Sequence, residues 1–410
     1  MTAADALVDD LFRREAGRIA AWLARLLGAG RLDLIEDAVQ DAFGAAVARW
    51  PLDGIPDRPA AWLTIAARNK ALDRLKREAR LAPFDEAAAW RLGFANPEEI
   101  GRLDDTLALM FVACHPALTP DEQTMLVLKT VCGFGVGEIA RAYLSTGEAV
   151  TQRLVRAKRR IGALGLRFEI PEGPELATRL PPLLQALYLL FNGGYTAGPG
   201  EKLMAPEICA EALRLAELLA AHRVTATGEV RALAALICFH HARAQSRTGA
   251  DGDLVLLADQ DRSLWDRALI ARGMAHLAAA RTSETLTPLH VEAAIASVHA
   301  TAPSFAATDW SALGHFYDLL EVLKPSPVVQ LNAAIVHAEV AGPAAGLDRL
   351  DPLACTARLA GYALYHAARG ELLLRLDRRP DAAKAFAAAL ACPVNEAERA
   401  HLTRRLEACA

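Results

Sequence analysis

Cationic and hydrogen-bonding side chains gather between residues 148 and 160 of this 410-residue chain. Arg and Gln side chains can form paired hydrogen bonds with base edges, and Lys, Thr and further Arg side chains suit phosphate oxygens. At about 3.6 residues per turn, the apolar residues fall on one stripe, Val150, Leu154, Ala157 and Ile161. The opposite side is therefore predicted to contact nucleic acid, through Glu148, Ala149, Thr151, Gln152, Arg153, Arg156, Lys158 and Arg159.

Position along this helix predicts the role of each side chain. Gln152 and Arg156 lie where the second helix of a helix-turn-helix meets base edges, so we expect them to read bases. The flanking side chains are expected to hold phosphates: Thr151, Arg153, Lys158 and Arg160. Ser145, with Glu148 three residues later, predicts a capping box at the helix start. The alternative is an ordinary helix hairpin with a solvated basic face.

The charge of the chain is strongly uneven. Its net charge of -4 does not indicate a general nucleic-acid binder. Residues 129–168, however, hold 8 Lys/Arg against 2 Asp/Glu, and residues 81–128 hold 2 against 8. A local basic face of this kind predicts binding that weakens steeply with salt.

Two amphipathic helices are predicted before residue 80. The first, over 34–50, buries Ile35, Ala38, Val39, Ala42, Val47 and Trp50. Its other face carries Glu36, Asp37, Gln40 and Asp41. The second, over 60–78, follows the prolines of GIPDRP and places Lys70, Arg74 and Arg77 on one face, beside Asn69, Asp73 and Lys76. Periodicity alone also allows a salt-bridged surface helix.

These segments resemble a known family. IEDAVQDAF and PAAWLTIAARNKALDRLKRE are similar to the second conserved region of bacterial RNA polymerase sigma factors of the extracytoplasmic-function (ECF) group. VTQRLVRAKRRI is similar to their fourth region. PLDGIPDRPAAWL, DDTLALMFVACHPALTPDEQ and LLFNGGYTA resemble a subgroup that carries a long C-terminal helical extension of tetratricopeptide-like character. With this extension the resemblance spans essentially the whole chain.

The resemblance implies that the protein binds rather than catalyses. It implies that the coiled coil of the polymerase clamp is bound by Asp33, Glu36, Asp37, Gln40 and Phe43. It implies that the promoter -10 element is contacted by Pro56, Asp57, Arg58, Asn69, Lys70, Asp73, Arg74 and Arg77. The loop 56–59 would capture a base flipped out of the stack. The basic helix then reads the -35 element. We expect no catalytic site, cofactor or metal, and we place Trp62 in the core.

Composition predicts an all-α chain, because nearly every apolar pattern has a helical period. We expect domains at 1–80, 101–168 and 180–410, with linkers at 81–100 and 169–179. FNGGYTAGPG, residues 191–200, is expected to be a turn. The chain is expected to be soluble and cytoplasmic, without a membrane partner and with seven scattered thiols.

The segment 361–410 is expected to form a tetratricopeptide-like hairpin in which Gly370, Ala382, Phe386 and Ala389 let two helices nest. We expect the extension to modulate the sigma domains by binding a regulatory protein or ligand. Two other classes remain open: a one-component regulator that binds an operator without polymerase, and a helical-repeat scaffold. The regulator has no use for the acidic and basic helices of residues 33–80, and in the scaffold the basic helices would be solvated surface.

Overall fold

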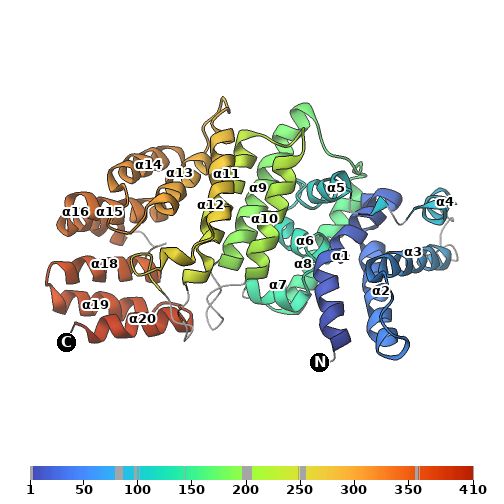
Figure 1. The fold of residues 1–410 in the computed structure, drawn as a ribbon, viewed down its shortest axis with the longest axis horizontal. Coiled ribbons are helices and arrows are strands. Elements are labelled where there is room, and N and C mark those ends of the chain that lie inside the picture. The colour runs from blue at the N-terminus through green and yellow to red at the C-terminus, as the bar shows by residue number, and fades with distance from the viewer. Residues whose placement is uncertain are drawn as a thin grey trace. The chain divides into compact units, whose positions relative to one another are not determined.

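The computed structural model describes residues 3–78, 86–96, 99, 100, 102–143, 145–195, 206–247, 249, 255–355, 359 and 361–409. Every regular element within these ranges is a helix, which confirms the all-α prediction (Figure 1). The chain divides into two compact units, Met1–Leu190 and Phe191–Ala410. None of the described helices is long and apolar enough to cross a membrane.

The first unit contains two groups of helices, which we call the region 2 half (residues 3–78) and the helix-turn-helix half (residues 103–163). The region 2 half comprises α1 (Ala3–Leu27), η1 (Ala29–Arg31), α2 (Leu32–Asp53) and α3 (Pro59–Glu78). After α4 (Glu86–Phe94), the helix-turn-helix half comprises α5 (Leu103–Ala113), α6 (Pro120–Thr130), α7 (Val136–Ala142) and α8 (Gly147–Ala163). The unit ends within α9 (Gly173–Tyr195).

Helix α2 packs beside α3 through a stripe that differs slightly from the predicted one (Figure 1). Val47, predicted to be buried, is 47% exposed, whereas Phe43 and Ala46 are buried. The spacing explains this, because positions 39, 43, 46 and 50 continue one helical stripe and position 47 lies a further residue around the helix. The α2 helix ends at Gly54, whose φ of 87° suits glycine and whose N–H donates to the Trp50 carbonyl.

Helix α8 begins one residue later than predicted. Its N-cap is Thr146, whose hydroxyl accepts a hydrogen bond from the Ala149 N–H at 3.2 Å. The predicted capping box of Ser145 and Glu148 is therefore wrong. The Ser145 N–H donates to Ala140 instead, so the preceding turn continues through residue 145. The predicted apolar stripe of α8 is fully buried, at Val150, Leu154, Ala157 and Ile161.

Helices also occupy segments that were expected to lack them. Within residues 81–100, α4 buries Ala88 and Leu92. Within residues 169–179, α9 begins at Gly173 and continues to Tyr195, so the predicted turn is wrong for residues 191–195. Glycines are tolerated here because they fall in the last turn, where the helix ends. Residues 196–200 of that predicted turn lie outside the described residues.

The second unit consists of successive helices. They are α10 (Pro206–Ala221), α11 (Gly228–Ala242), η3 (Ala244–Arg247), η4 (Arg262–Leu264), α12 (Arg267–Ala280), α13 (Pro288–Thr301), α14 (Trp310–Leu323), α15 (Pro327–Ala341), α16 (Pro343–Leu350), η5 (Asp351–Cys355), α18 (Ala363–Arg375), α19 (Arg379–Leu390) and α20 (Glu396–Glu407). Neighbours along the chain pack against one another, most extensively α11 on α12 and α18 on α19.

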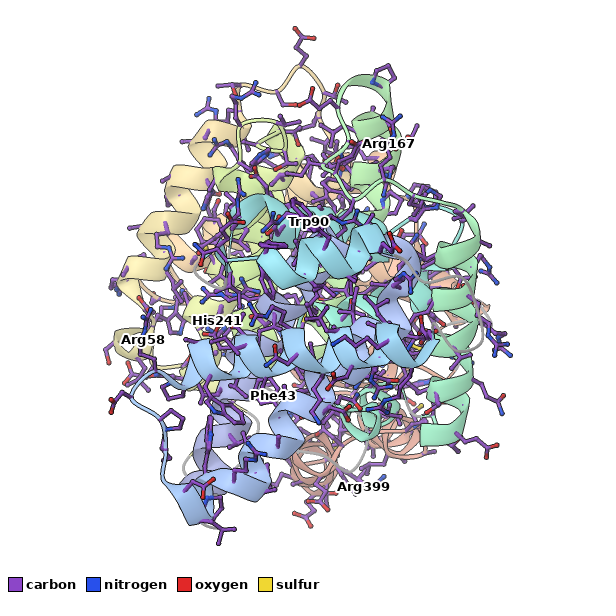
Figure 2. All side chains as sticks on the ribbon, turned by 90° about the vertical axis from the view of Figure 1, so that its right-hand side faces the viewer. Phe43, Arg58, Trp90, Arg167, His241 and Arg399 are labelled. Carbon is purple, nitrogen blue, oxygen red and sulfur yellow. The ribbon has the colours of Figure 1, made fainter. Side chains whose placement is uncertain are left out.

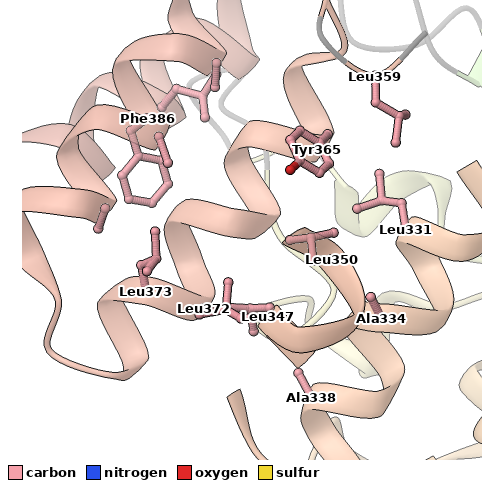
Figure 3. Close-up of a cluster of buried hydrophobic side chains, with 14 of the residues drawn as sticks. Leu331, Ala334, Ala338, Leu347, Leu350, Leu359, Tyr365, Leu372, Leu373 and Phe386 are labelled. Atoms are coloured by element: carbon pink, nitrogen blue, oxygen red, sulfur yellow. The ribbon is translucent and has the colours of Figure 1, made fainter. Parts of the chain in front are cut away.

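Small residues let these hairpins close. A Cβ on Gly370 of α18 would meet the Phe386 ring of α19 at 2.8 Å, and a Cβ on Gly273 of α12 would meet the Phe239 ring of α11 at 2.7 Å. Figure 3 shows the cluster around Phe386, to which α15, α16, α18 and α19 all contribute. The predicted nesting residues Ala382, Phe386 and Ala389 are all fully buried there.

Candidate nucleic-acid interface

The outer face of α8 presents polar side chains to solvent. Gln152, Arg156 and Arg159 are exposed, and within the described residues neither arginine makes an ion pair. Thr151 is exposed as well, but its hydroxyl donates to the Gly147 carbonyl at 2.8 Å. The Gln152 amide donates to Glu148 at 3.4 Å, a long contact that leaves the amide available to other acceptors. Two arginines without an ion pair to a described residue and one weakly held amide thus lie on one exposed face of α8.

Two further basic side chains of α8 point elsewhere. Arg160 donates to Glu122 at 2.9 Å and to the Ala117 carbonyl at 3.2 Å, which fixes α8 against the start of α6. Burial alone would raise the pKa of Glu122, but hydrogen bonds from Thr119 and the charge of Arg160 outweigh it and hold that pKa below its ordinary value. Arg160 therefore has a structural role in addition to any phosphate contact.

Lys158 lies on the side of α8 that faces α2. Its side chain is 9% exposed, and its ammonium group pairs with Asp33 at 2.6 Å and Glu36 at 2.8 Å. Burial alone would lower the pKa of Lys158, but the two carboxylates outweigh it, so the pKa lies above its ordinary value. The lysine is therefore charged at neutral pH. Because it lies beside the buried stripe of α8, its side chain does not reach the outer face that carries Gln152, Arg156 and Arg159. Ala149 and Arg153 are half-buried at the margins of that face.

The acidic side of α2 is partly covered. Asp37 and Asp41 remain exposed, and both pair with Arg74 of α3, at 2.9 and 3.0 Å. Gln40 is exposed and donates to Glu36 at 3.2 Å. Glu36 itself is only 17% exposed, because Lys129 also reaches it, at 3.2 Å.

Phe43 is only 4% exposed and packs edge-to-face on Phe12, with ring centroids 4.7 Å apart. Position 43 belongs to the apolar stripe of α2, and this is the physical reason that its ring turns inward. We therefore assign Phe43 to the core of the region 2 half rather than to a partner surface.

The α2–α3 loop and α3 form a second polar surface. Asp57 and Arg58 are exposed, and Arg58 projects from the loop (Figure 2). Along α3, Asn69, Asp73 and Arg77 are exposed, whereas Pro56 and Lys70 are half-buried. Arg74 is held by the two aspartates of α2, so part of this predicted DNA face is a salt-bridged surface.

Trp62 is half-buried and packs edge-to-face on the buried Trp50, at 5.6 Å. This contact agrees with the expectation that Trp62 belongs to the core.

Lys129 was not singled out in the sequence. Its side chain is 7% exposed, and a lysine buried to this extent needs an anionic partner. The signal was a single lysine within the apolar run MLVLKTV, residues 125–131. Among the described residues, no group of three or more His, Cys, Asp or Glu side chains is placed to hold a metal ion.

Residues 11–81, which span most of α1 and all of α2 and α3, match the sigma-70 region 2 family. This match supports a sigma factor, a protein of transcription initiation that binds core RNA polymerase and promoter DNA. Residues 179–281 match a family of unknown function, DUF6596.

The chain belongs to the same family as the Uncharacterized protein R00370 of Rhizobium meliloti (strain 1021). The two are 40% identical over 384 residues, which cover 92% of this chain and 90% of that protein. No solved structure matches the chain.

Proposed function

We propose that this protein is a sigma factor of the ECF type, which directs core RNA polymerase to promoters through a -10 and a -35 element. The observation that carries the proposal is the free polar face of α8, with Gln152, Arg156 and Arg159 exposed on a helix-turn-helix. This helix lies in the same compact unit as the residues that match sigma-70 region 2. A duplex reader joined to a polymerase-binding domain is the arrangement that promoter selection requires.

In this proposal some side chains of α8 read bases and others hold phosphates. Gln152 lies in the N-terminal half of the helix, which enters the major groove in helix-turn-helix complexes, and Arg156 follows one turn later on the same face. Arg156 is suited to guanine and Gln152 to adenine, because each can form two hydrogen bonds with the edge of that base. Thr151, Arg153 and Arg159 border this pair and would hold phosphates. Lys158 would join them only when it is released from Asp33 and Glu36.

The region 2 half would contact polymerase and the opening -10 element. The carboxylates of Asp37 and Asp41 remain exposed on α2 and suit a basic partner. Asp57 and Arg58 in the α2–α3 loop, with Asn69 and Arg77 on α3, supply hydrogen-bonding groups beside a separated strand. Extruding a base costs a few kcal/mol, which these contacts must offset.

The second unit would regulate this activity. We propose that its stacked hairpins are tetratricopeptide-like and bind a regulatory protein or ligand, since close helix pairs of this kind build extended surfaces. Removing residues 196–410 leaves α9 whole and should change promoter-specific transcription at equal protein concentration. Unchanged transcription would refute a regulatory role.

The central test is reconstitution with core polymerase. Holoenzyme should form an open complex on promoters selected from genomic DNA. Arg156→Ala should lose about 1–3 kcal/mol of binding, roughly 5- to 150-fold, at one -35 position. Arg167→Ala is the matched control, because Arg167 lies beyond the C-terminus of α8 and is 85% exposed.

Two results would overturn the proposal. One is a failure of the chain to associate with core polymerase. The other is DNA binding that is equally tight and specific without polymerase, which would indicate an operator-binding regulator instead.

A further inference from the structure

A chain of ion pairs, anchored on two buried lysines, joins the two halves of the first unit. Glu36 of α2 lies between Lys129 of α6 at 3.2 Å and Lys158 of α8 at 2.8 Å, and Lys158 also reaches Asp33 at 2.6 Å. Both lysine side chains are at least nine-tenths buried. On α1, Arg25 pairs with Asp105 of α5 at 3.0 Å. Charged groups therefore occupy the interface from both sides.

Glycines bring the two backbones into direct contact at the same interface. A Cβ on Gly17 of α1 would lie 1.8 Å from the Val131 carbonyl oxygen, which directly follows α6. Gly162 of α8 and Gly30 of η1 meet similarly, since a Cβ on either would lie 3.9 Å from the Cα of the other. The helix-turn-helix half thus rests directly on the region 2 half, and no side chain separates them at these points.

A small cavity beside the ion pairs shows that the fit is incomplete. It has a volume of about 20 Å³ and is large enough for one water molecule. Most of its lining is apolar, and Glu36, Gln40, Lys129 and Thr130 supply the polar groups. A water molecule that hydrates these polar groups in place lowers the free energy needed to separate the two surfaces.

We propose that this arrangement is a closed, autoinhibited state of the sigma factor, in which the helix-turn-helix half covers Glu36 and pairs with Asp33 on the acidic face of α2. The inference rests on the proposed function. Asp33 and Glu36 are the carboxylates of that face whose partners come from α6 and α8, and Asp37 and Asp41 pair only within the region 2 half. Polymerase reaches the full acidic face only after the helix-turn-helix half has moved away.

The same opening releases a DNA contact. When Lys158 leaves Asp33 and Glu36, its ammonium group becomes available to a phosphate, and the carboxylates become available to the clamp. One conformational change thus completes both binding surfaces. By linkage, polymerase binding then raises affinity for promoter DNA, and DNA raises affinity for polymerase by the same factor.

A reversible disulfide tests the closed state directly. Gly30→Cys with Gly162→Cys would place two thiols where the backbones meet, at a separation suited to a disulfide. The six native cysteines whose side chains are described are all buried, and the single cysteine variants control for the remaining thiol. The full-length variant is oxidised or reduced and titrated with core polymerase. Each single cysteine variant, treated in the same way, is the matched control.

The closed state predicts at least a tenfold loss of polymerase affinity in the oxidised double variant, with full recovery on reduction. Equal affinity in the two redox states would overturn autoinhibition and leave the sigma function intact. If neither the wild-type chain nor the reduced variant binds polymerase, the proposed function itself fails.

A second variant decides the question if the double variant does not fold. Lys129→Gln removes one ion pair from Glu36 at a position that we assign to neither DNA nor polymerase. It should raise polymerase affinity several-fold by favouring the open state. Unchanged or weaker binding of a folded Lys129→Gln chain would overturn the proposal.

Discussion

Gly17→Ala should force the helix-turn-helix half away from α1. The new Cβ would lie 1.8 Å from the Val131 oxygen, 2.8 Å from the Val131 carbonyl carbon and 3.3 Å from the Val131 Cα. All three atoms belong to the backbone, so no change of rotamer can make room. Ordinary contact begins at about 3.4 Å, so the two segments must separate or the closed interface must strain.

The magnitude follows from the cost of overpacking. Inserting a methyl group into a close-packed contact costs about 1–3 kcal/mol, and this cost falls only on the closed state. The higher helix propensity of alanine stabilises α1 equally in both states and therefore cancels. The equilibrium between open and closed states should shift by about 1–3 kcal/mol, roughly 5- to 150-fold.

The assay is energy transfer between dyes placed on the two halves. Leu52, at the end of α2, and Arg167, after α8, are both 85% exposed and accept labels through cysteine substitution. Gly17→Ala should lower the transfer efficiency. Gly93→Ala is the matched control, because a Cβ at Gly93 meets no atom within 4 Å. A folded Gly17→Ala chain with the transfer efficiency of the control would refute the reasoning.

Two further predictions concern the second unit. Gly346→Ala should destabilise it by about 1–3 kcal/mol in urea unfolding, because the new Cβ would lie 2.4 Å from the Ala338 Cβ. Gly314→Ala should leave the stability unchanged, because a Cβ at Gly314 meets no atom within 4 Å. Equal stability of the two variants would contradict the packing. Burial, reinforced by Arg243, holds the pKa of His240 at about 3 and that of His299 at about 4. The unfolded chain therefore binds more protons below about pH 6.5, and stability should fall towards pH 4 by up to about 1.4 kcal/mol per pH unit for each histidine. A melting temperature that does not change over this range would contradict the burial of these rings.

Periodicity predicted the local features of the site and missed the long-range ones. The buried stripe of α8 and the limits of α3 follow from residues three and four apart, which a helix always places on one face. The inward orientation of Lys158 depends on Asp33 and Glu36, more than 120 positions earlier in the chain. No local pattern carries that information.

The errors at the helix start and in the α2 stripe have a similar cause. Ser145 and Thr146 are both good caps, and only the Ser145 hydrogen bond to Ala140 decides between them. Phe43 was assigned to a partner through family resemblance, whereas its position on the stripe favours burial against Phe12. A backbone hydrogen bond within the turn decided the first case, and a tertiary contact decided the second.

The charged groups at the interface favour an interface that can open over one that stays closed. Apolar side chains of similar volume often stabilise a buried interface as well as an ion pair does, because ions lose hydration when they are buried. The charges of Lys129, Glu36 and Lys158 therefore stabilise the closed interface only moderately, so that the loss of one ion pair is enough to favour the open state. Charged groups, unlike apolar ones, return to water at low cost when the surfaces part. The open state then presents carboxylates and an ammonium group to two partners of opposite charge.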